Sequence, residues 1–222
     1  FLAEYAWKSH DPSTANNYTY QHGQTLLLSG SYSKRGMSLL LQAKRSQDMA
    51  FRSRRTISNA SSACYINHLP AFAYQHTYAL AALYPYATQM APGEWAFQGE
   101  LGYNFKRRTP LGGKYGTNLK LNVSHVRGID QRTDATHTNE PGGNGAASKF
   151  FDMGPETYYQ DINVQLEKKL TKQFKLNLMY SNQRYNQLVV EGHGERAIKS
   201  NIFVAEGKYQ FSPKFTLRAE AQ

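Results

Sequence analysis

The stretch Glu94-Trp-Ala-Phe-Gln-Gly-Glu-Leu-Gly-Tyr-Asn-Phe-Lys106 decides the fold. Its odd-numbered residues are aromatic, aliphatic or glycine, whereas its even-numbered residues are mostly polar or charged. Successive side chains of a β-strand point to opposite faces, so this period of two predicts a strand with one apolar and one polar face. Trp95 and Phe105 lie at the two ends of the apolar face, and Gly99 and Leu101 lie in its middle.

The same alternation recurs along most of the 222-residue chain and predicts an all-β fold. We expect an antiparallel transmembrane β-barrel with about ten strands, forming one domain over residues 1–222. The expected strands are residues 1–8, 25–33, 37–44, 77–84, 94–106, 118–123, 158–167, 174–181, 198–210 and 215–222. Because the chain ends in mid-alternation, we expect it to be an incomplete fragment of a larger barrel.

Composition excludes several other classes of protein. Lys and Arg number 26 against 16 Asp and Glu, a formal net charge of +10, and only 40% of the residues are hydrophobic. No run approaches the roughly 20 continuous apolar residues that a membrane-spanning helix needs. The single cysteine, Cys64, excludes an internal disulfide framework and a Cys-based zinc site. We expect no metal and no cofactor.

Half-apolar strands suit either a soluble sandwich or barrel with its apolar face inward, or a membrane barrel with its apolar face outward. Aromatic residues near strand ends, charged residues in the middle of the polar faces, and alternating tight and long connections favour the membrane barrel. The tight connections are 33–36, 168–173 and 212–214, and the long ones are 10–24, 127–156 and 185–197. The residues expected to form aromatic girdles are Trp7, Trp95, Tyr103, Phe105, Tyr158, Phe174, Tyr180 and Phe215. A soluble β-protein remains the alternative.

Four further stretches are distinctive as sequence: they are Thr77-Tyr-Ala-Leu-Ala-Ala-Leu-Tyr-Pro-Tyr-Ala-Thr88, Leu111-Gly-Gly-Lys-Tyr-Gly-Thr117, Tyr158-Tyr-Gln-Asp-Ile-Asn-Val-Gln-Leu-Glu-Lys-Lys-Leu170 and Asn201-Ile-Phe-Val-Ala-Glu-Gly-Lys-Tyr-Gln-Phe211. They resemble an uncharacterised, porin-like outer-membrane β-barrel family of Bacteroidota, whose domain has no known function. The resemblance extends over nearly the whole chain but carries no catalytic or ligand-binding residue. It implies a barrel fold, an outer-membrane location and a longer parent chain with further strands on both sides.

The direction of the strands predicts an inserted segment. Neighbouring barrel strands run in opposite directions, yet the strands that begin at Met37 and Thr77 would both run outward, so the chain between them must recross the membrane. Residues 46–76 lack the alternation of a lipid-facing strand, and we predict that they form a lumenal constriction or plug. The alternative is that one connection is misassigned. The basic residues expected to line the lumen there are Lys44, Arg45, Arg52, Arg54 and Arg55.

These features predict a function without covalent chemistry. The adjacent Ser124 and His125 point to opposite faces of a strand and cannot pair, so we expect no enzyme. Nucleic acid is not expected as a partner, because the aromatic residues lie away from the basic ones. We predict porin-like or channel-like passage of small solutes in a bacterial outer membrane. The alternative is a non-conducting structural or accessory barrel of an outer-membrane secretion, assembly or uptake complex. The expected partners are outer-membrane lipid and lipopolysaccharide, and further outer-membrane or periplasmic proteins are candidates.

Overall fold

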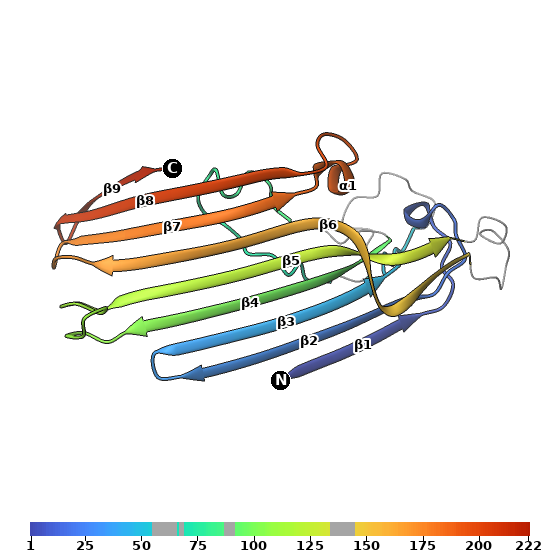
Figure 1. The fold of residues 1–222 in the computed structure, drawn as a ribbon, viewed down its shortest axis with the longest axis horizontal. Coiled ribbons are helices and arrows are strands. Elements are labelled where there is room, and N and C mark those ends of the chain that lie inside the picture. The colour runs from blue at the N-terminus through green and yellow to red at the C-terminus, as the bar shows by residue number, and fades with distance from the viewer. Residues whose placement is uncertain (55–65, 67–68, 87–91, 134–144) are drawn as a thin grey trace.

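The computed structural model describes residues 1–54, 66, 69–86, 92–133 and 145–222. Within them, nine strands form one antiparallel sheet in chain order (Figure 1). The strands are β1 (Leu2–Lys8), β2 (Gly23–Lys34), β3 (Met37–Gln47), β4 (Gly93–Phe105), β5 (Thr117–Thr133), β6 (Ala146–Lys169), β7 (Phe174–Tyr185), β8 (Ile198–Ser212) and β9 (Phe215–Ala221). Two short helices, η1 (Thr14–Asn16) and α1 (Gln187–Glu191), complete the described elements. The all-β, antiparallel fold is confirmed. The sheet is open, with β1 and β9 at its edges, as expected for part of a barrel wall.

The connections at the two ends of the sheet differ in length (Figure 1). At one end, here called the turn end, β-strands are joined by residues 35–36, 106–116, 170–173 and 213–214. At the other, the loop end, they are joined by residues 9–22, 48–92, 134–145 and 186–197. Gly36 permits the tight turn between β2 and β3, because its φ of +86° is strained for any residue with a side chain.

The apolar face of the sheet is the exposed one. On the polar face of β4, Ala96 and Gln98 are only 0% and 9% exposed. On the opposite face, Gly99 lies between Leu41 of β3 and Val123 of β5, and these two side chains are 56% and 49% exposed. This distribution is the reverse of that in a water-soluble sheet packed on a core.

Residues 77–84 do not form the strand that we predicted. The Ala82 N–H donates to the Tyr78 carbonyl at 2.9 Å, and the Leu83 N–H donates to the Leu80 carbonyl at 3.3 Å, as in a helical turn. Tyr78 and Ala81 pack with Met179, Ile202 and Val204. β3 pairs directly with β4, so residues 48–92 are a single connection. The prediction of a strand over residues 77–84 was wrong, because an Ala- and Leu-rich stretch also suits a helical turn. The argument from strand direction depended on that strand and is therefore wrong as well.

β5 and β6 extend beyond the rest of the sheet and form a bent hairpin, residues 127–133 paired with 146–157. The predicted loop at 127–156 is therefore mostly strand. The register shifts three times between Val126 and Gln131, which bends the hairpin. Gly154 lies at the bend, where a Cβ atom would approach the Ile129 carbonyl oxygen to 2.6 Å. The hairpin covers Trp95, whose indole N–H donates to the Asp152 carbonyl at 3.3 Å.

Candidate functional site on the polar face

Residues 69–86, here called the cross-face segment, lie against the polar face of the sheet. Their first anchor is Lys44, whose Nζ lies 2.7 Å from Glu94 Oε1 and donates to the Pro70 carbonyl at 2.6 Å. The Tyr86 hydroxyl donates to the other oxygen of Glu94. The side chains of Lys44 and Glu94 are fully buried. Burial of two charges is costly unless additional hydrogen bonds satisfy them, and the carbonyl and the phenol supply those bonds.

A second set of contacts fastens the middle of the segment to β6. His76 Nε2 lies 2.7 Å from Asp161 Oδ2, and the side chains of both residues are buried. Asp161 also accepts hydrogen bonds from Ser181 Oγ at 2.7 Å and Asn163 Nδ2 at 2.8 Å. Asp161 is thus held in place by side chains from two strands, and its contact with His76 fixes the position of the segment on the sheet.

Further contacts of the segment run from β5 to β8. The Tyr74 N–H donates to Ser124 Oγ at 3.2 Å, and Gln183 Nε2 donates to the Ala81 carbonyl at 2.8 Å. The Tyr78 hydroxyl donates to Glu206 Oε2 at 2.9 Å. The cross-face segment therefore meets polar groups from several neighbouring strands.

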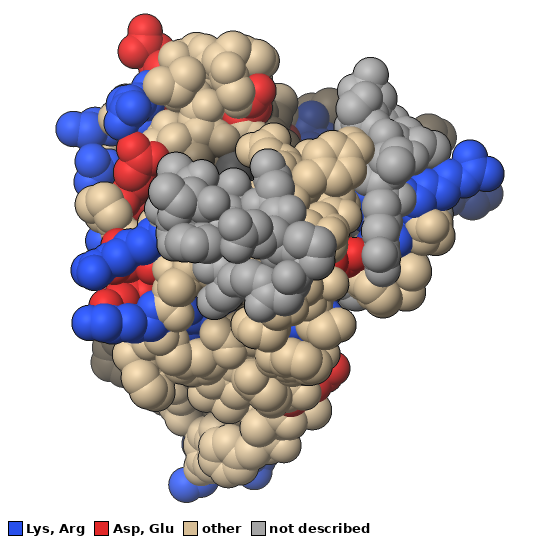
Figure 2. Space-filling model, turned by 90° about the vertical axis from the view of Figure 1, so that its right-hand side faces the viewer, with Lys and Arg blue, Asp and Glu red and all other residues tan. Residues whose placement is uncertain are grey.

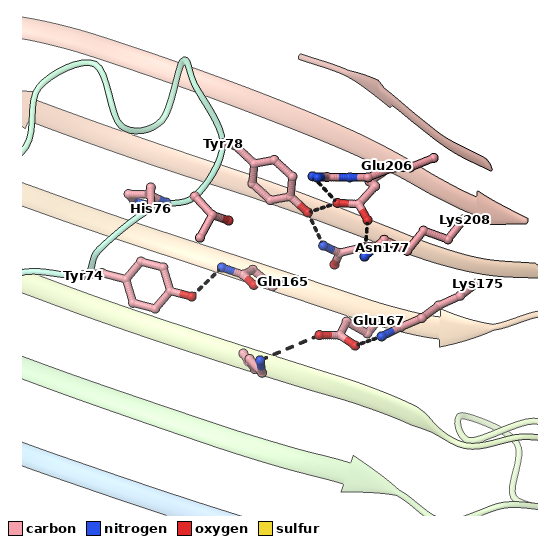
Figure 3. A pocket seen from close by; sticks show the side chains of 12 residues that line it. Tyr74, His76, Tyr78, Gln165, Glu167, Lys175, Asn177, Glu206 and Lys208 are labelled. Atoms are coloured by element: carbon pink, nitrogen blue, oxygen red, sulfur yellow. Dashed lines mark hydrogen bonds and ion pairs between the residues drawn. The ribbon is translucent and has the colours of Figure 1, made fainter. Parts of the chain in front are cut away.

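A cavity of about 430 Å³ lies between this segment and β5 to β9 (Figure 3). Tyr74, His76 and Tyr78 line it from the segment. Its charged lining consists of four cations and two carboxylates, an excess of two positive charges. The charged residues are Lys120, Lys175, Lys208, Arg218, Glu167 and Glu206.

Each carboxylate in the cavity is shared by two cations (Figure 3). Glu167 lies 2.5 Å from Lys175 Nζ and 3.7 Å from Lys120 Nζ. Glu206 lies 3.1 Å from Lys208 Nζ and 2.9 Å from Arg218 Nη2. Arg218 also lies 2.6 Å from Glu220 Oε2, outside the cavity lining, so the cations around the cavity exceed their carboxylate partners by one.

The five basic residues that we predicted for the lumen are distributed over different surfaces. Lys44 lies on the polar face and is paired with Glu94. Arg45 points to the apolar face, because neighbouring residues of a strand alternate. Its guanidinium carbon lies 4.7 Å from the Phe150 ring centre, under the bent hairpin. Arg52 is partly buried and Arg54 is exposed, whereas Arg55 lies outside the described residues.

The predicted girdle residues divide into two groups. Six lie on the apolar face with at least part of the ring exposed. They are Trp7, Tyr103, Phe105, Phe174, Tyr180 and Phe215. Trp95 and Tyr158 are each only 8% exposed. Trp95 is covered by the bent hairpin. Tyr158 lies at a register shift and packs in the core with Val126, Tyr159 and Tyr185.

Sequence reasoning did not single out the cations of the cavity. The alternation places Lys120, Lys175, Lys208 and Arg218 on polar strand faces, and this placement can be predicted from the sequence. Their convergence depends on the cross-face segment, which closes over them from a distant part of the chain. No local pattern of residues signals that approach.

None of the helices in the described part of the chain is both long and apolar enough to span a membrane. Over the same residues, no three or more His, Cys, Asp or Glu side chains gather in a way that could hold a metal ion.

The fold and the site define an all-β protein with a single antiparallel sheet, an exposed apolar face and a polar face covered by its own chain. Over residues 1–222, the chain matches the model of a family of unknown function, DUF6029. The chain belongs to this family. No curated protein matches it.

Proposed function

We propose that the chain forms part of the wall of a β-barrel in a bacterial outer membrane, and that the barrel passes small polar solutes past a constriction formed by the cross-face segment. The observation that carries this proposal is the arrangement of the two faces. An exposed apolar face that extends across a whole sheet is a liability in water, whereas in lipid it is the favourable arrangement. The covered polar face then corresponds to the lumen.

The height of the apolar face agrees with this proposal. On β6, Ile162, Val164 and Leu166 lie on that face between the polar residues Gln160 and Lys168. At about 3.4 Å per residue, Gln160 and Lys168 are roughly 27 Å apart along the strand. A barrel strand tilted by about 40° would then span roughly 20 Å of membrane, close to the apolar band of about 25 Å in outer-membrane barrels.

The two ends of the sheet support the outer membrane in particular. Bacterial outer-membrane barrels have short periplasmic turns and longer extracellular loops. The turn end would then face the periplasm, and the loop end would face the outside. The resemblance of the sequence to barrels of Bacteroidota supports the same location.

The cavity suggests which solutes would be favoured. The side chains that line it carry an excess of two positive charges, which Glu220 beside Arg218 reduces to one, and they surround a partly enclosed space. Small anions would therefore be favoured over small cations, because rings of basic side chains select for anions in pores.

The test is conductance of the full-length protein in planar bilayers. We expect discrete open steps with a preference for anions, and the double variant Lys175→Gln/Lys208→Gln should reduce that preference. Lys172→Gln/Lys214→Gln removes the same charge from exposed turns outside the cavity and should leave the selectivity unchanged. Absence of any conductance from correctly inserted protein would contradict passage of solutes.

A second candidate function is favoured by the anchoring of the cross-face segment. Its buried contacts with Glu94, Asp161 and Glu206 suit a permanently closed barrel that serves as a structural or accessory subunit. The same experiment separates the two functions. A silent barrel that copurifies with other outer-membrane proteins supports the accessory subunit.

A further inference from the structure

A row of polar and basic side chains crosses four strands at the loop end of the apolar face. His125 on β5 lies opposite Gln160 on β6, Gln160 lies opposite Arg184 on β7, and Arg184 lies opposite Lys199 on β8. Four residues back along β7, toward the turn end, Tyr180 faces Phe203 on β8, and these two side chains are 44% and 59% exposed. The row therefore marks the level at which the exposed apolar face gives way to polar groups.

Two cations of this row lie directly opposite each other. Arg184 and Lys199 form a cross-strand pair on the outward face, and both are exposed. Like charges in such a pair repel and destabilise the sheet. No ion pair joins either of them to a carboxylate within the described part of the chain, whereas Arg196 nearby pairs with Glu156 at 2.7 Å. An anion from outside the protein would remove the repulsion.

A third cation lies on the same face of β5. Arg127 donates through Nε and Nη2 to the Gly154 carbonyl at 3.0 and 2.6 Å. This contact holds the guanidinium at the base of the bent hairpin but leaves its charge without a carboxylate partner. Figure 2, which looks onto the loop end, shows Lys and Arg side chains along the left-hand margin of the molecule, with Asp and Glu side chains among them.

We propose that Arg127, Arg184 and Lys199 bind the phosphate groups of a lipid head group in the outer leaflet. This inference rests on the proposed membrane location. The cations lie just beyond the apolar face, at the depth of lipid phosphates, and they point toward the lipid rather than into the lumen. Guanidinium and ammonium groups are the side chains best suited to bind phosphate.

The spacing of the cations favours a head group with more than one phosphate. β5 and β8 are three strand spacings apart, about 14 Å at roughly 4.8 Å each. One phosphate can contact the adjacent Arg184 and Lys199, whereas Arg127 is two strand spacings, about 10 Å, from Arg184 and is held on the Gly154 carbonyl, so it would bind a second phosphate. A glycolipid that carries two separated phosphates can contact all three.

The test measures lipid retained by the full-length protein in detergent, with native mass spectrometry as the readout. The probes are a diphosphorylated lipid A and the same glycolipid without its phosphates. We expect the wild type to retain the diphosphorylated form at least about tenfold better. Arg184→Gln/Lys199→Gln should lose most of this preference, and Lys172→Gln/Lys214→Gln, an equal loss of charge at the turn end, should keep it.

Three outcomes would overturn the inference. One is equal retention of the two glycolipids by the wild type, and another is equal preference in the wild type and Arg184→Gln/Lys199→Gln. The third is displacement of the glycolipid by millimolar inorganic phosphate, which would indicate a site for free anions. Insertion into lipid vesicles, followed by protection of the strands from protease, is scored separately. Failure to insert would overturn the proposed membrane function as well, so the two failures are distinguishable.

Discussion

At the scale of single residues, Lys44 joins the cross-face segment to the sheet, because it donates to the Pro70 carbonyl while it forms a buried ion pair with Glu94. Lys44→Met removes the cation of its fully buried ion pair with Glu94. We expect the free energy of unfolding to fall by about 3–5 kcal/mol, the usual result of breaking a buried ion pair. Urea unfolding of the protein in detergent measures it.

Lys120→Met is the matched control for this prediction. Lys120 Nζ lies 3.7 Å from Glu167, and the two side chains are 57% and 22% exposed. An exposed pair of this kind contributes about 0–1 kcal/mol, because solvent screens it. Equal losses in Lys44→Met and Lys120→Met would show that the buried pair does not anchor the segment.

Asp48, just beyond the end of β3, makes stability depend on pH. Burial raises its pKa to about 6, although Lys8 and the Asn16 side chain partly oppose the shift. The folded protein then holds a proton that the unfolded chain has already lost. The contribution of Asp48 to stability is therefore highest below about pH 4, falls as the pH rises to about 6, and is constant above.

Asp48→Asn should remove this fall and raise the free energy of unfolding at pH 8 by on the order of 1–3 kcal/mol. Asparagine also tolerates the positive φ of +43° at this position. Unfolding measured between pH 3.5 and pH 8 checks the prediction, with Asp130→Asn on the exposed hairpin as the control. An unchanged dependence on pH in Asp48→Asn would assign it to another group.

At the scale of elements, the bend of the β5–β6 hairpin depends on the absence of a side chain at Gly154. Gly154→Ala would place a methyl group 2.6 Å from a backbone oxygen, which cannot move aside without shifting β5. We expect the hairpin to lift from β4 and expose Trp95. Quenching of tryptophan fluorescence by acrylamide should increase, measured in a Trp7→Phe background so that Trp95 reports alone.

Gly99→Ala provides the control on the flat part of β4. Its methyl group would lie 3.4 Å from the end of the Leu41 side chain, an ordinary contact. Quenching should stay at the parent level. A parent-level result for Gly154→Ala as well would mean that the hairpin does not cover Trp95 through this bend.

At the scale of the whole molecule, the two faces of the sheet distinguish a membrane protein from a soluble one. Leu121 is on the apolar face of β5, midway between Thr117 and His125. In a bilayer, Leu121→Arg would place a charge near the midplane and cost about 2–4 kcal/mol. Reversible unfolding from lipid vesicles measures this cost.

Asn104→Arg, at an exposed position on the polar face near the turn end, is the matched control and should change stability by less than about 1 kcal/mol. A soluble sheet would tolerate Leu121→Arg equally well, since Leu121 is already 38% exposed. Similar small effects for the two arginine variants would therefore contradict the membrane location.

Prediction from sequence succeeded where a local pattern determines the structure. The strands around Trp95–Phe105 and Phe174–Tyr180 follow from their period of two, because that period is a property of the extended backbone itself. The same pattern places carboxylates such as Asp161 and Glu206 on the polar face, where they lie in the structure. It failed at residues 77–84, where packing of Tyr78 and Ala81 decided between a strand and a helical turn.

The sequence by itself determined the class of fold, the division of each strand into an apolar and a polar face, and the positions of the tight turns, because these depend on residues close together in the chain. Only the tertiary structure decided what covers the polar face and which cations converge there. The contacts of Lys44 with the Pro70 carbonyl, His76 with Asp161 and Tyr78 with Glu206 join residues far apart in sequence. Their geometry arises from the packing of one connection across the sheet, which no local alternation specifies.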